Sequence, residues 1–120
     1  PPIDLIQISP RVERVGVAPD AIPVRFALGQ NYPNPFNPET WLPFELAADT
    51  NVSITIYDAA GRHIRNLNLG LQSAGAYLTK EKAAYWNGRS DTGELVSSGV
   101  YFYRLSAGDF QATKRMIILK

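Results

Sequence analysis

The chain has 120 residues, the length of one domain, and its 12 lysines and arginines against 11 acids leave a formal net charge of +1. So small a charge excludes strong attraction to nucleic acid or anionic lipid, and the absence of cysteine excludes disulfides, thiolate metal sites and thiol nucleophiles. No stretch approaches the roughly eighteen apolar residues of a membrane helix, so we expect a soluble domain without membrane insertion.

Proline interrupts the first 23 residues repeatedly, at Pro1-Pro2, Pro10, Pro19 and Pro23. Because proline lacks the N–H donor that a sheet ladder needs, we expect residues 1–23 to be a linker with at most an edge strand. The opening residues lack the basic and apolar regions of a signal peptide. We therefore expect any export signal to lie elsewhere in the gene, and the folded domain to span residues 24–120.

Residues 24–28 have the pattern of a strand and lead into a proline-rich segment over residues 30–38. The three prolines of that segment disfavour helix and central sheet, so we expect an ordered loop or an edge. Apolar residues alternate within residues 40–46 and predict a strand. We expect Leu42, Phe44 and Leu46 to lie on one face of this strand. Pro43 predicts that this strand lies at a sheet edge.

Residues 52–57 alternate strictly between apolar and polar side chains, which predicts a half-buried strand. Residues 58–61 end in a glycine that tolerates a positive φ, so we expect a turn and a hairpin with residues 62–67 as the returning strand. The spacing between Ile64 and Leu67 breaks the alternation and predicts a bulge.

Residues 70–94 are the least periodic part of the chain. We expect a short strand within residues 77–82 and a buried aromatic anchor at Tyr85-Trp86. The last third predicts a hairpin, with strands over residues 99–105 and 110–119. No window has the 3.6-residue period of a capped helix, and about seven strands spaced near ten residues apart predict an all-β sandwich of two sheets.

Few residues could support catalysis. The single histidine, His63, has no second histidine with which to form a metal pair. Asp91-Thr92-Gly93 matches the tripeptide of aspartic proteases, but its polar flanks favour a tight turn. Asp58, Asp91 and Asp109 could supply oxygens to calcium, yet no spacing resembles a calcium loop, and calcium binding stays open. We therefore expect no enzymatic activity and no cofactor.

Two groups of side chains admit both a structural and a functional interpretation. The aromatic residues could form a platform that stacks on sugar rings, although core or cross-strand pairing is the commoner role in a small sandwich. These residues are Trp41, Tyr57, Tyr77, Tyr85, Trp86, Tyr101 and Tyr103. Lys114, Arg115 and Lys120 could protect a strand edge against pairing or belong to a terminal signal.

The segment from Leu28 to Thr40, LGQNYPNPFNPET, resembles the opening signature of the C-terminal sorting domains recognised by type IX secretion. That family is similar in fold to the immunoglobulin-like domain of the flagellar hook-capping protein. The resemblance continues in order at Ile56-Tyr57-Asp58, Gly61-Arg62, Trp86-Asn87-Gly88-Arg89, residues 98–105 and residues 113–120. It covers about residues 26–120 and implies an immunoglobulin-like antiparallel β-sandwich.

The resemblance also implies a non-catalytic sorting and attachment module of a larger bacterial protein, secreted or held at the cell surface after passage through the periplasm. Its partners would be the carrier protein that precedes it and a protein of the outer-membrane secretion machinery, and the domain itself would be a monomer. The alternative function is a carbohydrate-binding or spacer accessory domain of a secreted enzyme. Asn87 stands where the family usually has Asp, which puts any metal role of that position in doubt.

We expect two recognition segments and a set of structural residues. Proline stiffens the first segment, which lowers the entropy lost on binding, and the final strand offers an edge for strand addition. The recognition residues are Asn31, Tyr32, Pro33, Asn34, Pro35, Phe36, Asn37, Pro38, Lys114, Arg115 and Lys120. The structural residues are Asp58, Gly61, Arg62, Trp86, Gly88, Gly99 and Tyr101.

Overall fold

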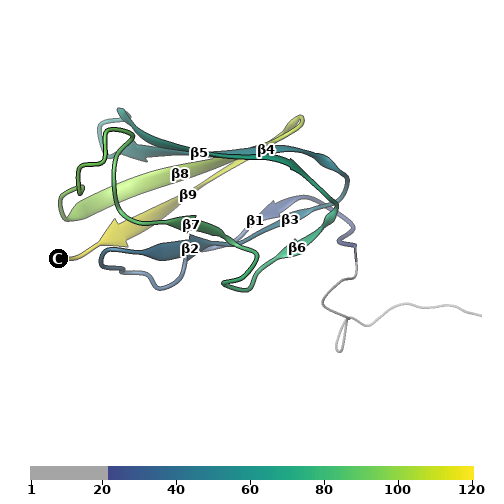
Figure 1. Ribbon diagram of the computed structural model, residues 1–120, viewed down its shortest axis with the longest axis horizontal. Helices are drawn as coiled ribbons and strands as arrows, with labels where there is room; N and C mark the ends of the chain where they lie inside the picture. The colour runs from purple at the N-terminus through teal and green to yellow at the C-terminus, as the bar shows by residue number, and fades with distance from the viewer. Residues whose placement is uncertain (1–21) are drawn as a thin grey trace, which may run out of the picture.

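The computed structural model of the protein describes residues 22–120. These residues form nine β-strands and no helix, arranged in two facing layers (Figure 1). The described range therefore contains no helix that could cross a membrane. The predicted linker over residues 1–23 lies outside the described residues, apart from Ile22 and Pro23.

One layer is a four-stranded antiparallel sheet with the strand order β5-β4-β8-β9. Its strands are β4 (Thr50–Asp58), β5 (His63–Gln72), β8 (Gly99–Ala107) and β9 (Phe110–Ile118). Alternate residues of β4, namely Val52, Ile54 and Ile56, are buried, and the residues between them are partly exposed. The predicted alternation is thus confirmed, and so is the C-terminal hairpin of β8 and β9.

The predicted hairpin after residue 57 is also confirmed. β4 and β5 pair antiparallel, and the register shifts where Ile56 faces Arg65 but Tyr57 faces His63. Ile64 therefore has no partner on β4 and forms the predicted bulge, which increases the local twist.

The other layer consists of two short sheets that follow one another along the sandwich (Figure 1). The first contains β1 (Ala27–Leu28), β3 (Phe44–Leu46) and β6 (Gly75–Tyr77), and the second contains β2 (Thr40–Leu42) and β7 (Ala84–Trp86). Leu42, Phe44 and Leu46 are all buried, which confirms that they share one face. The division between the sheets falls at Pro43, which has no N–H to donate to a ladder.

The predicted edge position of Pro43 is wrong. β3 lies between β1 and β6, and β2 pairs with β7 on one side while Trp41 bridges Tyr32 on the other. Proline is tolerated in the middle of this layer because it separates two short ladders. Its carbonyl still accepts the N–H of Gly29 at 2.9 Å.

The prediction for residues 77–86 is only partly right. β6 ends at Tyr77, and residues 78–82 form a loop and turn in place of the predicted strand. Trp86 is buried, but Tyr85 is 47% exposed. The two side chains point in opposite directions because they are neighbours on β7, and successive residues of a strand face opposite sides.

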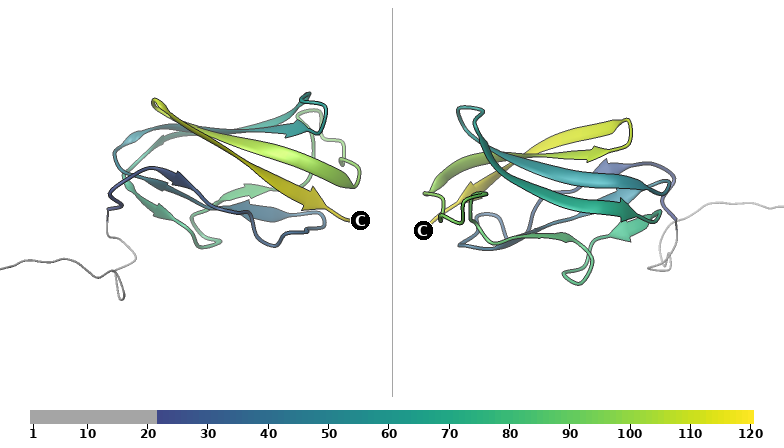
Figure 2. Two further views of the ribbon diagram at one scale, coloured as in Figure 1. Left: turned by 180° about the vertical axis from the view of Figure 1, so that it is seen from behind. Right: turned by 45° about the horizontal axis from the view of Figure 1, so that its top comes forward.

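The core lies between the two layers, where Trp86 and Phe36 from one side meet Tyr101 from the other. The ring centroids of Trp86 and Phe36 are 5.7 Å apart, and those of Trp86 and Tyr101 are 6.1 Å apart. Figure 2 shows β9 crossing diagonally from the four-stranded sheet towards the second layer. Its last residues thereby approach the proline-rich loop.

Candidate recognition surface

Distant parts of the chain meet at the end of the sandwich where the C-terminus lies (Figure 1). We call this region the motif end and define it as residues 33–39, 58–62, 87–98 and 117–120. The described chain begins at Ile22 at the opposite end. Most stretches of the predicted recognition and structural motifs therefore lie at this end or in the core beneath it, whereas Tyr32, Lys114 and Arg115 lie outside both.

The proline-rich loop covers part of the outer edge of β9. Phe36 and Ile118 form a parallel bridge, in which the N–H of Phe36 donates to the carbonyl of Ile117 at 3.0 Å and the N–H of Leu119 donates to the carbonyl of Phe36 at 3.1 Å. The side-chain oxygen of Asn34 accepts the N–H of Ile117 at 3.0 Å. Asn34 therefore pairs with the strand as backbone would, and the loop occupies the place of a further strand.

This arrangement restricts the prediction that the final strand offers its edge for strand addition, because the loop covers the C-terminal end of that edge. The outward backbone groups of Ile117 and Leu119 are already paired with the loop, and Gln30 Nε2 donates to the carbonyl of Arg115 at 2.8 Å. A partner strand cannot pair there without displacing the loop. The proline-rich segment and the C-terminal end of β9 instead lie side by side.

The residues of the predicted recognition string have different roles in the structure. Asn31 and Phe36 are buried. The N–H of Asn31 donates to the Tyr103 hydroxyl at 2.8 Å, and its side-chain amide donates to Thr40 Oγ1 at 3.0 Å. The peptide bonds before Pro33, Pro35 and Pro38 are cis. The members left exposed for a partner are Pro33, Asn34, Pro35, Asn37 and Pro38.

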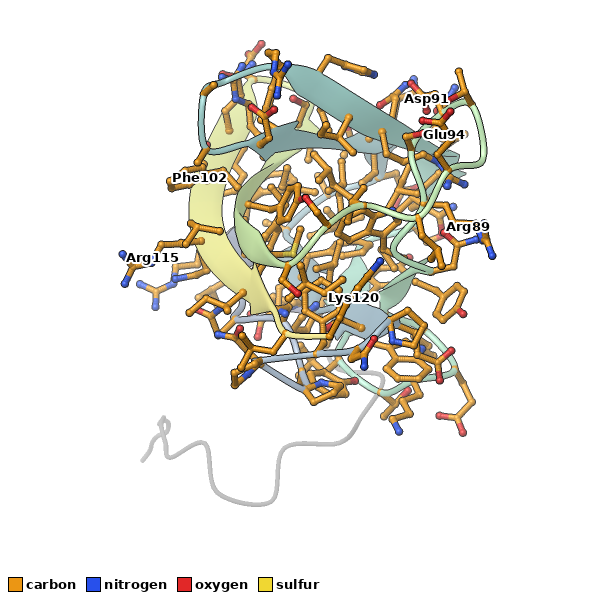
Figure 3. All side chains as sticks on the ribbon, turned by 90° about the vertical axis from the view of Figure 1, so that its left-hand side faces the viewer. Arg89, Asp91, Glu94, Phe102, Arg115 and Lys120 are labelled. Atoms are coloured by element: carbon orange, nitrogen blue, oxygen red, sulfur yellow. The ribbon has the colours of Figure 1, made fainter. Side chains whose placement is uncertain are left out.

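The basic residues near the chain end do not form one patch. Lys114 lies on the inward face of β9 with Met116, whereas Arg115 is exposed on the opposite face. The backbone N–H of Lys120 donates to Ser98 Oγ at 2.9 Å. Figure 3 looks onto the motif end and shows Arg115 and Lys120 well apart. A charged residue on the inward face of an edge strand opposes edge-to-edge association, so Lys114 fits the structural interpretation.

Asp58 and its neighbours build the turn at the motif end. Asp58 Oδ1 accepts the N–H groups of Ala60 at 3.0 Å and Arg62 at 2.9 Å, and Oδ2 accepts Arg62 Nε at 2.8 Å. The N–H of Arg62 is the main reason that the pKa of Asp58 lies below its usual value. Gly61 occupies the turn position with φ of 85°.

Gly88 lets the loop over residues 87–98 pack against Pro38. Its φ is 78°, and a Cβ at this position would lie 2.5 Å from the carbonyl oxygen of Pro38. The same loop is attached to the core by a hydrogen bond in which Trp86 Nε1 donates to the carbonyl of Arg89 at 2.9 Å. Tyr101 is buried beside Trp86, and Gly99 is the first residue of β8.

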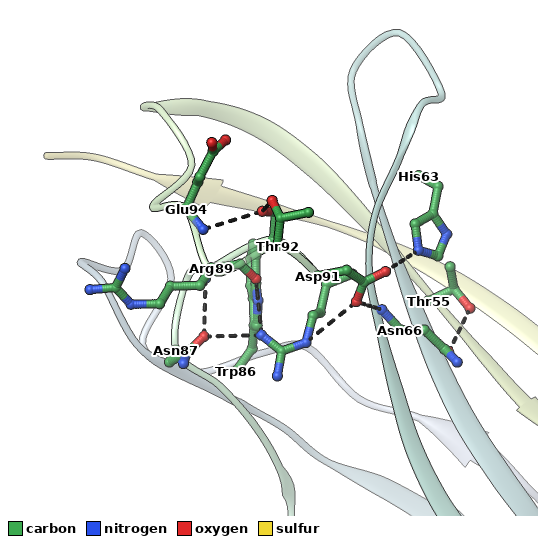
Figure 4. A network of polar contacts seen from close by, with 11 residues as sticks. Thr55, His63, Asn66, Trp86, Asn87, Arg89, Asp91, Thr92 and Glu94 are labelled. Atoms are coloured by element: carbon green, nitrogen blue, oxygen red, sulfur yellow. Dashed lines mark hydrogen bonds and ion pairs between the residues drawn. The ribbon is translucent and has the colours of Figure 1, made fainter.

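A polar network attaches this loop to β5 (Figure 4). The N–H of Asp91 donates to the carbonyl of Ile64 at 2.9 Å, and Asp91 Oδ1 accepts the N–H of Asn66 at 3.1 Å. Asp91 Oδ2 lies 2.7 Å from His63 Nε2, and Arg65 Nη1 donates to the carbonyl of Arg89 at 3.1 Å. The hydrogen bond to His63 is the main reason that the pKa of Asp91 is lowered.

The sequence did not indicate the pairing of His63 with Asp91, which are 28 residues apart. The prediction that Asp91-Thr92-Gly93 forms a turn is confirmed, since the N–H of Gly93 donates to the carbonyl of Ser90 at 2.9 Å. The side chains of His63 and Asp91 are 51% and 47% exposed. Within residues 22–120 no three metal-binding side chains lie together.

A row of three aromatic rings lies on the outer surface of the sheet of β2 and β7. We call Tyr32, Trp41 and Tyr85 the aromatic row; its neighbouring ring centroids are 6.4 Å and 5.5 Å apart. Lys80 Nζ lies 4.3 Å from the centroid of the Trp41 ring. The Tyr85 hydroxyl donates to Glu39 Oε1 at 2.7 Å, which raises the pKa of Tyr85. Trp41 and Tyr85 are paired across β2 and β7, as predicted for part of the aromatic set.

Comparison with known protein families addresses the fold directly. The FlgD Ig-like domain family matches residues 39–109, from the start of β2 to the turn after β8. The chain belongs to this family. Membership in the FlgD Ig-like domain family agrees with the observed two-layer sandwich, and the predicted immunoglobulin-like all-β fold is confirmed.

Two solved structures are similar to this FlgD Ig-like domain. Dimeric latent PorU from Porphyromonas gingivalis shares 23% identity over 87% of the chain, with a TM-score of 0.62. FlgD from P. aeruginosa shares 24% identity over 61% of the chain, with a TM-score of 0.47. The chain spans 10% of the PorU chain and 54% of the FlgD chain. The likeness to PorU is one of fold. No curated protein matches the chain.

Proposed function

We propose that this FlgD Ig-like domain is a non-catalytic sorting and attachment module of a larger exported bacterial protein, and that its motif end is bound by a protein of the outer-membrane secretion machinery. The observation that supports this most is the joining of the proline-rich loop to the end of β9 by backbone hydrogen bonds. Segments that resemble sorting signals in the sequence form one surface, at the opposite end of the sandwich from Ile22 (Figure 1).

The position of this surface suits a module attached to a carrier. The described chain begins at the far end, and in this proposal the carrier protein precedes it and leaves the motif end accessible. The loop is held by β9 before any partner binds, which reduces the ordering entropy of recognition. In this proposal the domain is a monomer of a secreted or surface-held protein, and its surface supplies shape and hydrogen-bonding groups in place of reactive ones.

An export assay tests the proposal. All 120 residues are fused after an inert exported reporter in a bacterium with type IX secretion, and the reporter is measured in the periplasm, on the surface and in the medium. We expect the fusion to leave the periplasm, whereas the reporter alone stays there. A folded fusion that accumulates in the periplasm would contradict the assignment.

Surface variants then separate recognition from folding. Deleting residues 113–120 should also abolish export, but the deletion removes the buried Met116 and Ile118 from the core. The double variant Asn37→Lys with Arg115→Glu changes only exposed side chains, one in the proline-rich loop at the motif end and one on the neighbouring strand β9. We expect it to lower export several-fold with an unchanged thermal midpoint. Leu71→Lys, at a residue 72% exposed near the opposite end, is the matched control.

The aromatic row supports a second candidate function, that of a carbohydrate-binding accessory domain. Tyr85 is exposed, and Glu39 and Lys80 place charged hydrogen-bonding groups beside the rings. This function predicts binding on a glycan panel that Tyr85→Ala weakens. A panel without any signal would remove this candidate and leave the sorting proposal unaffected.

A further inference from the structure

A cleft of about 480 Å³ opens at the motif end between the turn over residues 58–62 and the segment over residues 94–101. A volume of this size is sufficient for one or two side chains of a bound segment. Figure 3 shows the Glu94 and Lys120 side chains at this end of the molecule. The cleft is separate from the covered edge of β9 and from the aromatic row.

The cleft is lined partly by apolar side chains that the fold leaves exposed. Leu95 is 47% exposed and Val100 is 37% exposed, and both line the cleft together with Ile64 and the buried Tyr101. Large apolar side chains exposed around one hollow are typical of binding sites.

The wall that carries Leu95 is held in place by backbone hydrogen bonds. The N–H of Val96 donates to the carbonyl of Gly88 at 3.0 Å, and the N–H of Ser90 donates to the carbonyl of Glu94 at 2.8 Å. The opposite wall is the turn stabilised by Asp58. The cleft is therefore formed before a ligand binds, which lowers the entropic cost of binding.

The cleft walls carry more negative than positive side chains. Asp58 and Arg62 neutralise each other through an ion pair of 2.8 Å. Glu94 also lines the cleft, and its carboxylate makes no ion pair with any residue of the described range 22–120. The lining side chains thus carry a net charge of −1, from two acids and one arginine. A ligand with a positive group beside an apolar group would match both properties.

We propose that the cleft accepts an apolar side chain of the protein that binds the motif end, and that a lysine or arginine next to this side chain pairs with Glu94. The proposal rests on the proposed function, because that function supplies a protein partner at this end. It names the chemistry of the contact, which the sorting assignment by itself leaves open.

Peptide binding tests the cleft without any export. The full chain, labelled with ¹⁵N, is titrated with acetyl-Leu-Lys-amide, acetyl-Leu-Glu-amide and acetyl-Gly-Lys-amide, and NMR shifts are followed. We expect the Leu-Lys peptide to bind most tightly and to shift residues 94–100. Glu94→Lys should reverse the preference in favour of the Leu-Glu peptide. Equal binding of all three peptides, or shifts elsewhere on the surface, would overturn the proposal.

Export of the reporter fusion provides the second readout. Ala60→Phe places a ring at the cleft from an exposed turn position whose backbone hydrogen bond to Asp58 is retained. We expect several-fold lower export with an unchanged thermal midpoint. If the parent fusion is exported and Ala60→Phe is exported equally well, the cleft proposal fails and the sorting proposal stands. If the parent is not exported, the sorting proposal fails.

The NMR experiment also includes the labelled chain alone at several concentrations. Concentration-dependent NMR shifts without peptide would identify a second copy of the chain as the occupant and overturn the cleft proposal.

Discussion

The buried hydroxyl of Tyr103 connects the two layers of the domain by hydrogen bonds. The hydroxyl of Tyr103 donates to the carbonyl of Gly29 at 2.7 Å and accepts the N–H of Asn31 at 2.8 Å. Burial raises the pKa of Tyr103 from 10.0 to about 12, so the hydroxyl stays protonated in the folded protein. One oxygen on β8 thereby positions the start of the proline-rich loop.

Removing this hydroxyl should destabilise the domain. Tyr103→Phe leaves the two partner groups unpaired, and we expect the free energy of unfolding in urea to fall by about 1–3 kcal/mol. Tyr57→Phe is the control, because the Tyr57 hydroxyl has no hydrogen bond to a residue within 22–120. Equal losses in the two variants would contradict the assignment.

The raised pKa of Tyr103 predicts a dependence of stability on alkaline pH. The contribution of the neutral hydroxyl is complete below the unfolded-state pKa of 10.0 and is lost as pH rises towards about 12. Tyr103→Phe should lack this part of the alkaline loss, which urea unfolding at a series of pH values measures.

Two loops and one strand contact one another at the motif end. The loop of residues 87–98 packs on the proline-rich loop at Gly88, and the proline-rich loop pairs with β9. The three segments therefore contact one another, and the N–H of Lys120 donates back to Ser98 Oγ in the loop of residues 87–98. A change at the contact between the two loops should be transmitted to the recognition surface.

Two glycines provide a matched test of that contact. Gly88 and Gly93 both have a positive φ, of 78° and 90°, so alanine strains the backbone at either position by about 1–2 kcal/mol. Only at Gly88 would the new Cβ collide with Pro38, since no atom lies within 4 Å of a Cβ at Gly93. We expect Gly88→Ala to lower the thermal midpoint more than Gly93→Ala and to reduce export. Equal midpoints would show that the loops do not depend on this contact.

The domain is a two-layer sandwich with one buried cluster between the layers. Its buried cluster extends from Leu28 to Ile118 and draws on both layers. The two ends differ in role, because one receives the preceding chain at Ile22 and the other gathers the motif segments (Figure 1). This polarity is the geometric basis of the proposed attachment function.

The extent of the cluster predicts that residues 22–120 fold without residues 1–21. We expect the shortened chain to unfold cooperatively at a thermal midpoint within error of the full chain, because it keeps every member of the buried cluster found within residues 22–120. A marked decrease would instead show that the first 21 residues contribute a strand, contrary to the predicted linker. Circular dichroism and calorimetry on both chains make the measurement.

Alternation along the chain was sufficient to predict the long strands and their inward faces. Val52, Ile54 and Ile56 are buried as their spacing required, and the bulge at Ile64 follows from a local break in the same pattern. β2 and β3 were detected because together they form one alternating run over residues 40–46. β6 and β7 each stand alone with three residues, too few for a period of two to be distinguished from a loop.

The class of fold, the hairpins and the absence of helix between residues 22 and 120 could be inferred from the residues alone, because they depend on the order of side chains over a few neighbours. Folding in three dimensions was needed to join the proline-rich loop to β9, to pair His63 with Asp91 and to separate the buried from the exposed members of the recognition string. The bridge between Phe36 and Ile118 consists of backbone hydrogen bonds. Almost every residue carries the same backbone groups, so the choice of partner leaves no trace in the sequence.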